Sequence, residues 1–271
     1  MKDTLNTDAS LPPILRGKIA AARSEFTPEN LLREARRQKS ITVDSVPEVC
    51  ILDPDGDMVR HLIASNIACR HHGWACYHTD LYSFTYEGVN FGIVGCAVGA
   101  PFAVLVAEEL FASGCRLLIS MTSAGQILSI KSPPYFIIID RALRDEGTSY
   151  HYLDAADYST VDSNLLRLCK DALTSAGNSV LVGATWTTDA PFRETAEAIA
   201  AAKKEGMLAV EMEAAALYAF AQARKKPVLC IAHVTNQLAR IEGDFEKGAY
   251  DGAEDSLKLI ATLVRAYQGG E

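Results

Sequence analysis

The sequence has 271 residues, of which 49% are hydrophobic and 22% charged, and its formal net charge is −8 at pH 7. This composition is typical of a globular domain, and the negative charge argues against nucleic acid or an anionic membrane as a partner. The seven cysteines are scattered, and neither a Cys-x-x-Cys pair nor a His/Cys spacing predicts a metal site. Because no long apolar run opens the sequence, we expect a cytoplasmic protein without a signal peptide or a membrane span.

Residues 1–45 are predicted to form an N-terminal arm and a helical extension. The arm is polar, and a short helix is predicted at 16–23. A second, basic helix should follow Thr27, because Thr-Pro-Glu combines an N-cap, a proline at the first helical position and an acid in the first turn. This helix would end near Lys39.

Residues 46–271 alternate between apolar strand-like runs and segments of helical period. Such strands, separated by helices, indicate one α/β domain with a mixed sheet that is covered on both faces. Strands are predicted at 46–52, 74–78, 82–86, 91–96, 116–121, 135–139, 180–185 and 228–234. Helices are predicted after residue 57 and at 99–113, 161–176, 193–205 and 246–267, and the stretch 208–220 turns from an apolar run into a helix.

The sequence Glu211-Met212-Glu213 stands at that last junction. An unpaired buried carboxylate is costly, whereas a carboxylate in a binding site can accept hydrogen bonds from two adjacent sugar hydroxyls. The methionine thioether can pack on the apolar face of the sugar ring. These three residues are therefore candidates for binding a sugar. The alternative is a solvated helix start, where acids are favoured by the helix dipole.

Other candidate segments also follow predicted strands, and ligands in open α/β sheets bind at the carboxyl ends of the strands. The run 56–60, Gly-Asp-Met-Val-Arg, combines a glycine that lets a phosphate approach the backbone with an arginine one turn later. An ordinary turn before a helix would have the same pattern. Gly99 precedes a second predicted helix, and Ser123 offers a hydroxyl in the run 120–125.

From about Val46 to Lys247, these segments and their order resemble the nucleoside phosphorylase family that includes uridine phosphorylase and the hexameric purine nucleoside phosphorylases. The resemblance implies a central, mixed, partly barrel-like β-sheet flanked by helices, and assembly into a homodimer or homohexamer. It further implies that Gly56, Arg60 and Ser123 bind phosphate.

In the sugar site, the resemblance implies that Glu213 holds the ribose 2′-hydroxyl while Met212 and Glu211 complete the site. The glycine-rich loop at Gly99 would bring backbone close to the sugar and phosphate.

The base would be bound by residues at two further strand ends. In pyrimidine-specific relatives the base-contacting side chains lie where this chain has Phe192 and Arg193. Purine-specific members carry an aspartate, a general acid, where this chain has Asn236, which has no titrating proton to donate. The amides of Asn236 and Gln237 can instead bind the carbonyl or imide of a pyrimidine, which favours a uridine-like substrate.

The phosphate site departs from the family pattern at two positions. The arginine expected at the start of the second phosphate loop is Ser120, and no arginine lies near 77–78, where the family borrows one from the neighbouring subunit. His78 is a candidate for partial replacement. Each charge-assisted hydrogen bond contributes about 1.5–3 kcal/mol, so the loss of two would weaken phosphate binding.

The leading hypothesis is a pentosyltransferase that cleaves a uridine-like nucleoside with phosphate as co-substrate, giving free base and ribose 1-phosphate without a cofactor or metal. The alternatives are an N-glycoside hydrolase that uses water, and a nucleoside-binding protein without catalysis.

Overall fold

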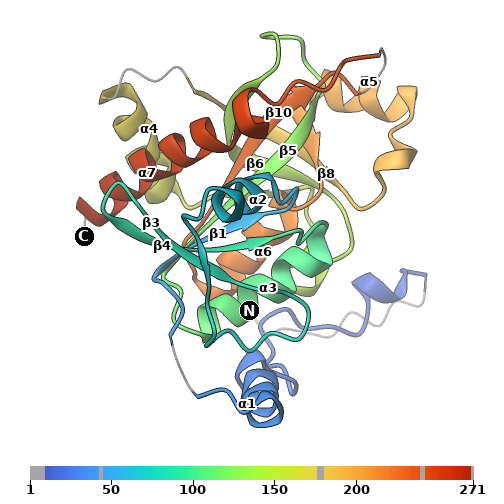
Figure 1. Cartoon of the computed structure of the whole chain (residues 1–271). Helices are drawn as coiled ribbons and strands as arrows, with labels where there is room; N and C mark the ends of the chain where they lie inside the picture. Colours follow the sequence, from blue (N-terminus) through green and yellow to red (C-terminus); the bar gives the residue numbers. More distant parts are fainter. Residues whose placement is uncertain (1–9, 43–44, 176–179, 239–241, 270–271) are drawn as a thin grey trace.

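The computed structural model, shown in Figure 1, describes residues 10–42, 45–175, 180–238 and 242–269. Ten strands form one mixed sheet, and five of them close into a ring because β10 pairs with both β5 and β6. The ring consists of β5 (Leu117–Gln126), β9 (Ala209–Glu211), β8 (Leu181–Thr188), β6 (Tyr135–Asp145) and β10 (Val228–Asn236). The predicted mixed, partly barrel-like sheet is therefore confirmed.

The remaining strands extend the sheet away from the ring. β1 (Val49–Asp53) lies parallel to β5 and to β4 (Val89–Gly95). An antiparallel hairpin joins β4 to β3 (Tyr82–Tyr86), which pairs with the short β2 (Cys69–Arg70). The short β7 (Tyr158–Thr160) pairs with β6.

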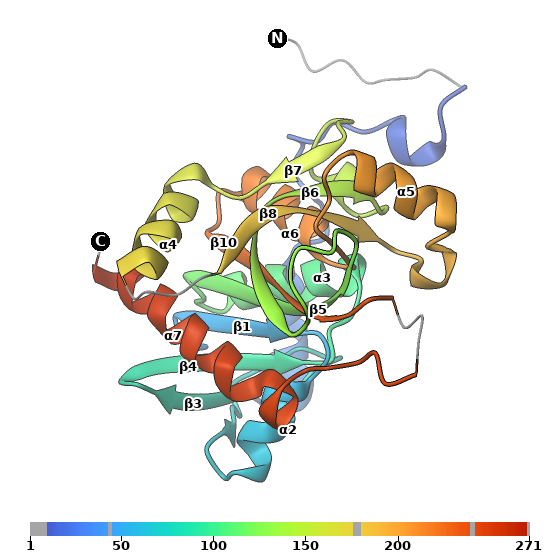
Figure 2. The same cartoon turned by 90° about the horizontal axis from the view of Figure 1, so that it is seen from above.

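Seven α-helices flank this sheet in the described part of the chain. They are α1 (Pro28–Lys39), α2 (Asp57–Ala64), α3 (Ala100–Ala112), α4 (Ser163–Ser175), α5 (Ala196–Lys204), α6 (Ala214–Arg224) and α7 (Ala253–Gly269). Helix α7 packs against α4 and α2 (Figure 2), α3 packs against α6, and α1 packs against α3. Among the described residues, no helix is both long and apolar enough to cross a membrane.

Helix α6 carries the candidate Glu-Met-Glu segment at its start and is buried from Ala214 to Phe220. Its alanines allow close approach to the sheet and to α3. The hydroxyl of Tyr218 donates to the Ile139 carbonyl at 2.6 Å and accepts from the Cys230 amide at 3.0 Å. The helix that positions the site is thus tied to two strands of the ring.

Three predicted elements differ in the structure. Residues 16–23 do not form a helix, and Gly17 there has φ +68°. Residues 74–78 are not a strand: Ala75 is buried against α1, and Lys39 Nζ donates to the Ala75 carbonyl at 3.1 Å. The last helix begins at Ala253 instead of 246, because four of the residues from 248 to 252 have positive φ.

Candidate active site

The parallel strands β1, β4, β5 and β10 end at the same edge of the sheet. Four candidate segments lie at this edge. Gly56 follows β1, Gly99 follows β4, Ser123 lies near the end of β5, and Asn236 ends β10. The fold therefore gathers segments that are far apart in the sequence.

Glu213 connects two of these segments, those of Gly99 and Ser123, to the start of α6. It is the N-cap of α6 and is only 1% exposed. Its Oε1 accepts a hydrogen bond from the Gly99 amide at 2.7 Å, and its Oε2 accepts one from the Thr122 hydroxyl at 2.8 Å. Each carboxylate oxygen can accept a second hydrogen bond. Burial, followed by the charge of Glu211, raises the pKa of Glu213 to about 7.

Glu211 has a different environment, because four protein donors occupy its carboxylate. Oε1 accepts from Thr185 at 3.1 Å and from the Thr187 hydroxyl. Oε2 accepts from the backbone amides of Glu213 and Ala214, both at 2.7 Å. Burial raises the pKa of Glu211. This geometry fixes the first turn of α6 to β8, while Met212 between the two acids is half-buried.

Ser123 and Asn236 meet through a residue that the sequence did not single out, Thr235. The hydroxyls of Ser123 and Thr235 are hydrogen-bonded, with 2.9 Å between their oxygens. The Asn236 amide donates to Thr235 Oγ1 at 3.1 Å, and its carbonyl accepts from the Leu238 amide at 2.9 Å. One N–H of the Asn236 side chain remains for a ligand.

The loop after β1 brings Arg60 over Gly56. Gly56 has φ +76°, and a Cβ on it would lie 2.7 Å from Cys96 Sγ and 2.8 Å from Arg60 Nη1. Arg60 Nη2 donates to the Asp55 carbonyl at 2.9 Å and pairs with Asp57. The approach of the guanidinium to Gly56 thus requires glycine.

Buried titratable groups lie beneath this loop. Asp53 accepts from the amides of Gly56 at 3.2 Å and Val59 at 2.9 Å, and burial raises its pKa to about 7. Burial, followed by the charge of Lys247, lowers the pKa of His233 to about 4. A cavity of about 20 Å³, room for one water molecule, lies between Asp53, Asp55, Asp57, Met58, Met121, Ser123, His233, Asp251 and Ser256.

Five predicted site residues are exposed: Arg60, described above, and four others. Phe192 is 99% exposed, and Arg193 beside it is also exposed, in a 3₁₀ turn after β8 (Pro191–Arg193). Gln237 is exposed, and its backbone amide donates to Asp244. His78 is exposed, with its ring 6.4 Å from that of Phe102 in α3.

Hydroxyl and lysine partners of the site were missed in the sequence. Thr122 stands one residue before the candidate Ser123, and Thr235 one residue before the candidate Asn236, so both adjoin a predicted site residue. Thr187 begins the strand end that leads to Phe192, and Lys247 ends the stretch that carries the resemblance. Neither was a candidate itself, because hydroxyls and lysines are common on strands and loops.

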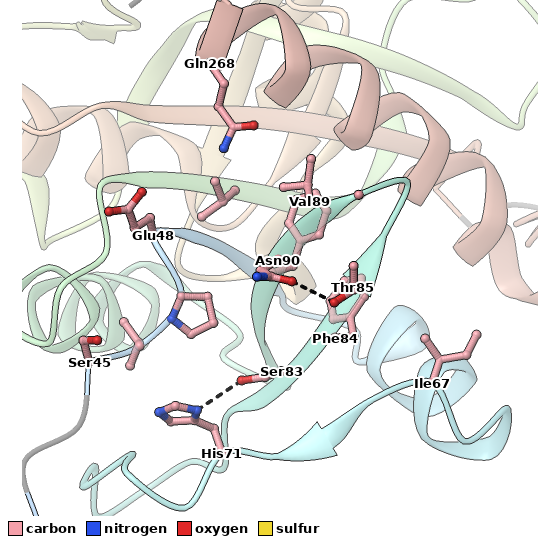
Figure 3. Close-up of a pocket in the computed structure, with 15 residues that line it drawn as sticks. Ser45, Glu48, Ile67, His71, Ser83, Phe84, Thr85, Val89, Asn90 and Gln268 are labelled. Carbon is pink, nitrogen blue, oxygen red and sulfur yellow. Dashed lines mark hydrogen bonds between the residues drawn. The ribbon is translucent and has the colours of Figure 1, made fainter.

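A larger groove, of about 750 Å³, lies elsewhere on the molecule (Figure 3). It is formed by the chain entering β1 at Glu48 and by the β3–β4 hairpin. Ser83 Oγ lies 3.1 Å from His71 Nδ1, and Thr85 donates to Asn90 at 2.7 Å. The groove faces the amino end of β1, whereas Gly56 follows its carboxyl end, so it is separate from the candidate site. Within the described residues, no group of three or more His, Cys, Asp or Glu side chains could hold a metal ion.

Comparison with known proteins agrees with this geometry. Residues 48–265 match the family model described as the phosphorylase superfamily, and the chain belongs to this family. The predicted kinship with nucleoside phosphorylases is thereby confirmed.

The curated relatives are themselves nucleoside phosphorylases. A DeoD-type purine nucleoside phosphorylase of Colwellia psychrerythraea is 29% identical over 68% of this chain and 79% of its own length. A guanosine phosphorylase of Halorubrum lacusprofundi is 27% identical over 67% of this chain and 78% of its own length. A DeoD-type purine nucleoside phosphorylase of Caldanaerobacter subterraneus is 28% identical over 70% of this chain and 82% of its own length.

Proposed function

We propose that this chain is a nucleoside phosphorylase, which transfers the pentosyl group of a nucleoside to phosphate and releases the free base. The buried Glu213 carboxylate, held between the Gly99 amide and the Thr122 hydroxyl, carries this proposal. A carboxylate fixed on one side by two donors, with acceptor capacity left on each oxygen, suits the vicinal hydroxyls of a ribose.

In the proposed mechanism the C1′–N bond breaks towards an oxocarbenium-like sugar, which phosphate attacks. Glu213 holds the 2′-hydroxyl and Met212 packs on the sugar. Phosphate would be bound by the backbone turn at Gly56, the guanidinium of Arg60 and the hydroxyl of Ser123. Phosphate is the co-substrate, and no covalent enzyme intermediate is required. A homodimer or homohexamer in the cytoplasm stays a prediction from the sequence.

The base is proposed to carry a carbonyl next to an imide N–H. Asn236 is buried, and its amide still has one free N–H for a carbonyl after bonding Thr235 and Leu238. Such an amide offers no proton to a purine N7. We therefore place uridine first, and the 6-oxopurine nucleosides inosine and guanosine next, since the relatives are named for purine nucleosides and guanosine.

Hydrolysis is the second candidate, and the charges of the phosphate site favour it. Ser120 stands where the family has an arginine, and its buried hydroxyl makes no hydrogen bond within the described chain. Arg60 is already paired with Asp57. A site with less free positive charge would accept water more readily than phosphate.

Base release from uridine, thymidine, inosine, guanosine and adenosine, each with and without phosphate, tests the proposal. We expect release only with phosphate, together with ribose 1-phosphate. Free ribose at the same rate without phosphate would establish hydrolysis instead. Nucleoside binding without release from any member of the panel would leave a binding protein. Glu213→Gln serves as the active-site control in each assay.

A further inference from the structure

The loop around Gly56 carries an unusual set of charges for an anion site. Asp55 and Asp57 flank the glycine, and Asp57 pairs with Arg60. Lys247 pairs with both carboxylates: its Nζ lies 2.7 Å from Asp55 Oδ2 and also contacts Asp57 Oδ2. Without Lys247, one guanidinium would face two carboxylates, and the loop would repel a phosphate dianion.

Lys247 is part of the chain between β10 and α7, and it is directed to this loop by its neighbours. The amide of Glu246 donates to the Thr235 carbonyl at 2.8 Å. The hydroxyl of Thr235 lies 2.9 Å from that of Ser123, the candidate phosphate ligand. The charge of Lys247 also acts on His233, which lines the same small cavity as Ser123, Asp55 and Asp57. Lys247 therefore lies beside both halves of the candidate phosphate site.

The ammonium group has hydrogen-bonding capacity left. It has three N–H donors, of which the carboxylates of Asp55 and Asp57 take two. The side chain is 23% exposed, so the group is neither free in solvent nor sealed in the core. The cavity of about 20 Å³ holds no more than a water molecule, so a bound phosphate requires some of the residues around it to move.

We propose that Lys247 is the second cation of the phosphate site and fulfils within one chain the role of the arginine that is absent at position 120. It neutralises Asp55 and Asp57 and gives its third N–H to a phosphate oxygen. Arg60 and Ser123 contribute the other contacts. The inference rests on the proposed function, because it assigns a ligand to the co-substrate of that reaction.

Lys247→Met removes the charge and retains the length of the side chain, and Lys247→Arg restores a cation. Lys258→Met is the matched control, because Lys258 lies on α7 and forms a 3.7 Å ion pair with Asp255 at an exposed position. For each full-length variant we would measure the apparent KM for phosphate, the KM for the nucleoside, and phosphate affinity by calorimetry.

In K247M we expect the KM and Kd for phosphate to rise about tenfold or more, which corresponds to the loss of one charge-assisted hydrogen bond. The nucleoside KM should change less than about threefold, and K247R should recover most of the phosphate affinity. Phosphate constants in K247M equal to those of K258M would overturn the inference. If K247M does not fold, Lys247→Gln is measured under the same criterion.

Failure of the proposed function itself gives a different result. A wild-type protein that releases base without phosphate and binds none by calorimetry would refute phosphorolysis before any variant is made. A wild-type protein that needs phosphate, with K247M unaffected, would refute only the role of Lys247.

Discussion

The backbone amide of Gly99 donates a 2.7 Å hydrogen bond to Glu213, 114 positions further along the chain. Gly99 has φ +87°, a backbone conformation that L side chains rarely adopt. This conformation lets the loop after β4 present its N–H to the carboxylate at the start of α6. The Glu213 carboxylate, proposed to bind the sugar, is therefore oriented before substrate arrives. Its orientation depends on the loop after β4 and the start of α6, which are far apart in the sequence.

Glu213→Gln should lower kcat/KM at least about tenfold, because an amide is a weaker acceptor for a sugar hydroxyl than a carboxylate. The NH2 end of the new amide would also point towards Gly99 or Thr122, both of which donate a hydrogen bond at present. The measurement is steady-state kinetics at saturating phosphate. Glu205→Gln is the control, since Glu205 is exposed and accepts a hydrogen bond from the Tyr158 hydroxyl at 2.6 Å. Equal kinetics in the two variants would remove Glu213 from the site.

Glu213 should lower the free energy of unfolding as the pH rises from about 4.5 to 7, whereas His233, whose pKa is lowered to about 4, acts in the opposite sense. The pKa of Glu213 is raised from 4.5 to about 7 in the folded state, so the native protein binds the proton more tightly than the unfolded chain does. The stabilisation is complete below the unfolded pKa and is lost as the pH passes through the folded one. Asp53 contributes with the same sign.

Urea unfolding at pH 5 and pH 8 checks this pH dependence. In Glu213→Gln the decrease between the two pH values should be smaller, by up to about 3 kcal/mol for a shift of this size. A decrease identical to that of the wild type would show that Glu213 is ionised equally easily in both states.

Glu211→Ala should destabilise the fold by about 3–5 kcal/mol, because it leaves two backbone amides and two threonine hydroxyls without their acceptor. Chemical unfolding measures this loss, and Glu205→Ala should change stability by less than about 1 kcal/mol. If Glu211 bound the sugar directly, Glu211→Ala would instead raise the nucleoside KM at nearly unchanged stability.

Gly56→Ala should raise the KM for phosphate about tenfold by displacing Arg60, since the new Cβ would lie 2.8 Å from its Nη1. Gly88→Ala is a matched control: Gly88 has φ +80°, but nothing lies within 4 Å of its added Cβ. Both variants should lose about 1–2 kcal/mol of stability from the positive φ. Only Gly56→Ala should raise the KM for phosphate. An equal phosphate KM in the two variants would argue against Arg60 as a phosphate ligand.

The places of Gly56, Gly99 and Ser123 at strand ends could be predicted from the sequence. Apolar strands alternating with helices require a covered sheet, and the carboxyl ends of its parallel strands meet at one edge. The apolar stretch 74–78 shows the limit of this reasoning. A short apolar run is consistent both with a strand and with another buried segment. In the structure this stretch is a loop, in which Ala75 packs against α1.

The partners within the site could not be predicted, because tertiary contacts select them. Thr122 reaches Glu213 over 91 positions, and Lys247 reaches Asp55 over 192. Threonine and lysine are both common on strands and loops, so their presence in the sequence does not indicate a site. The role of Glu211 depends likewise on Thr185 and Thr187, which only the pairing of β8 with β9 brings beneath α6.

Asn236→Asp should shift the base preference towards purine nucleosides. The local hydrogen bonds can adapt: the new carboxyl accepts from the Leu238 amide as Asn236 does, and Thr235 can donate to it if Ser123 donates to Thr235. Asn236 is 7% exposed, so a carboxyl there would have a raised pKa and would carry a proton near neutral pH. That proton could pass to a purine N7, whereas the charged form would repel a uracil carbonyl. We expect the ratio of kcat/KM for inosine to that for uridine to rise about tenfold or more, within the range for one general acid.

Kinetics with both nucleosides, at pH values from 6 to 8, provide the measurement. An unchanged ratio would mean that Asn236 does not face the base.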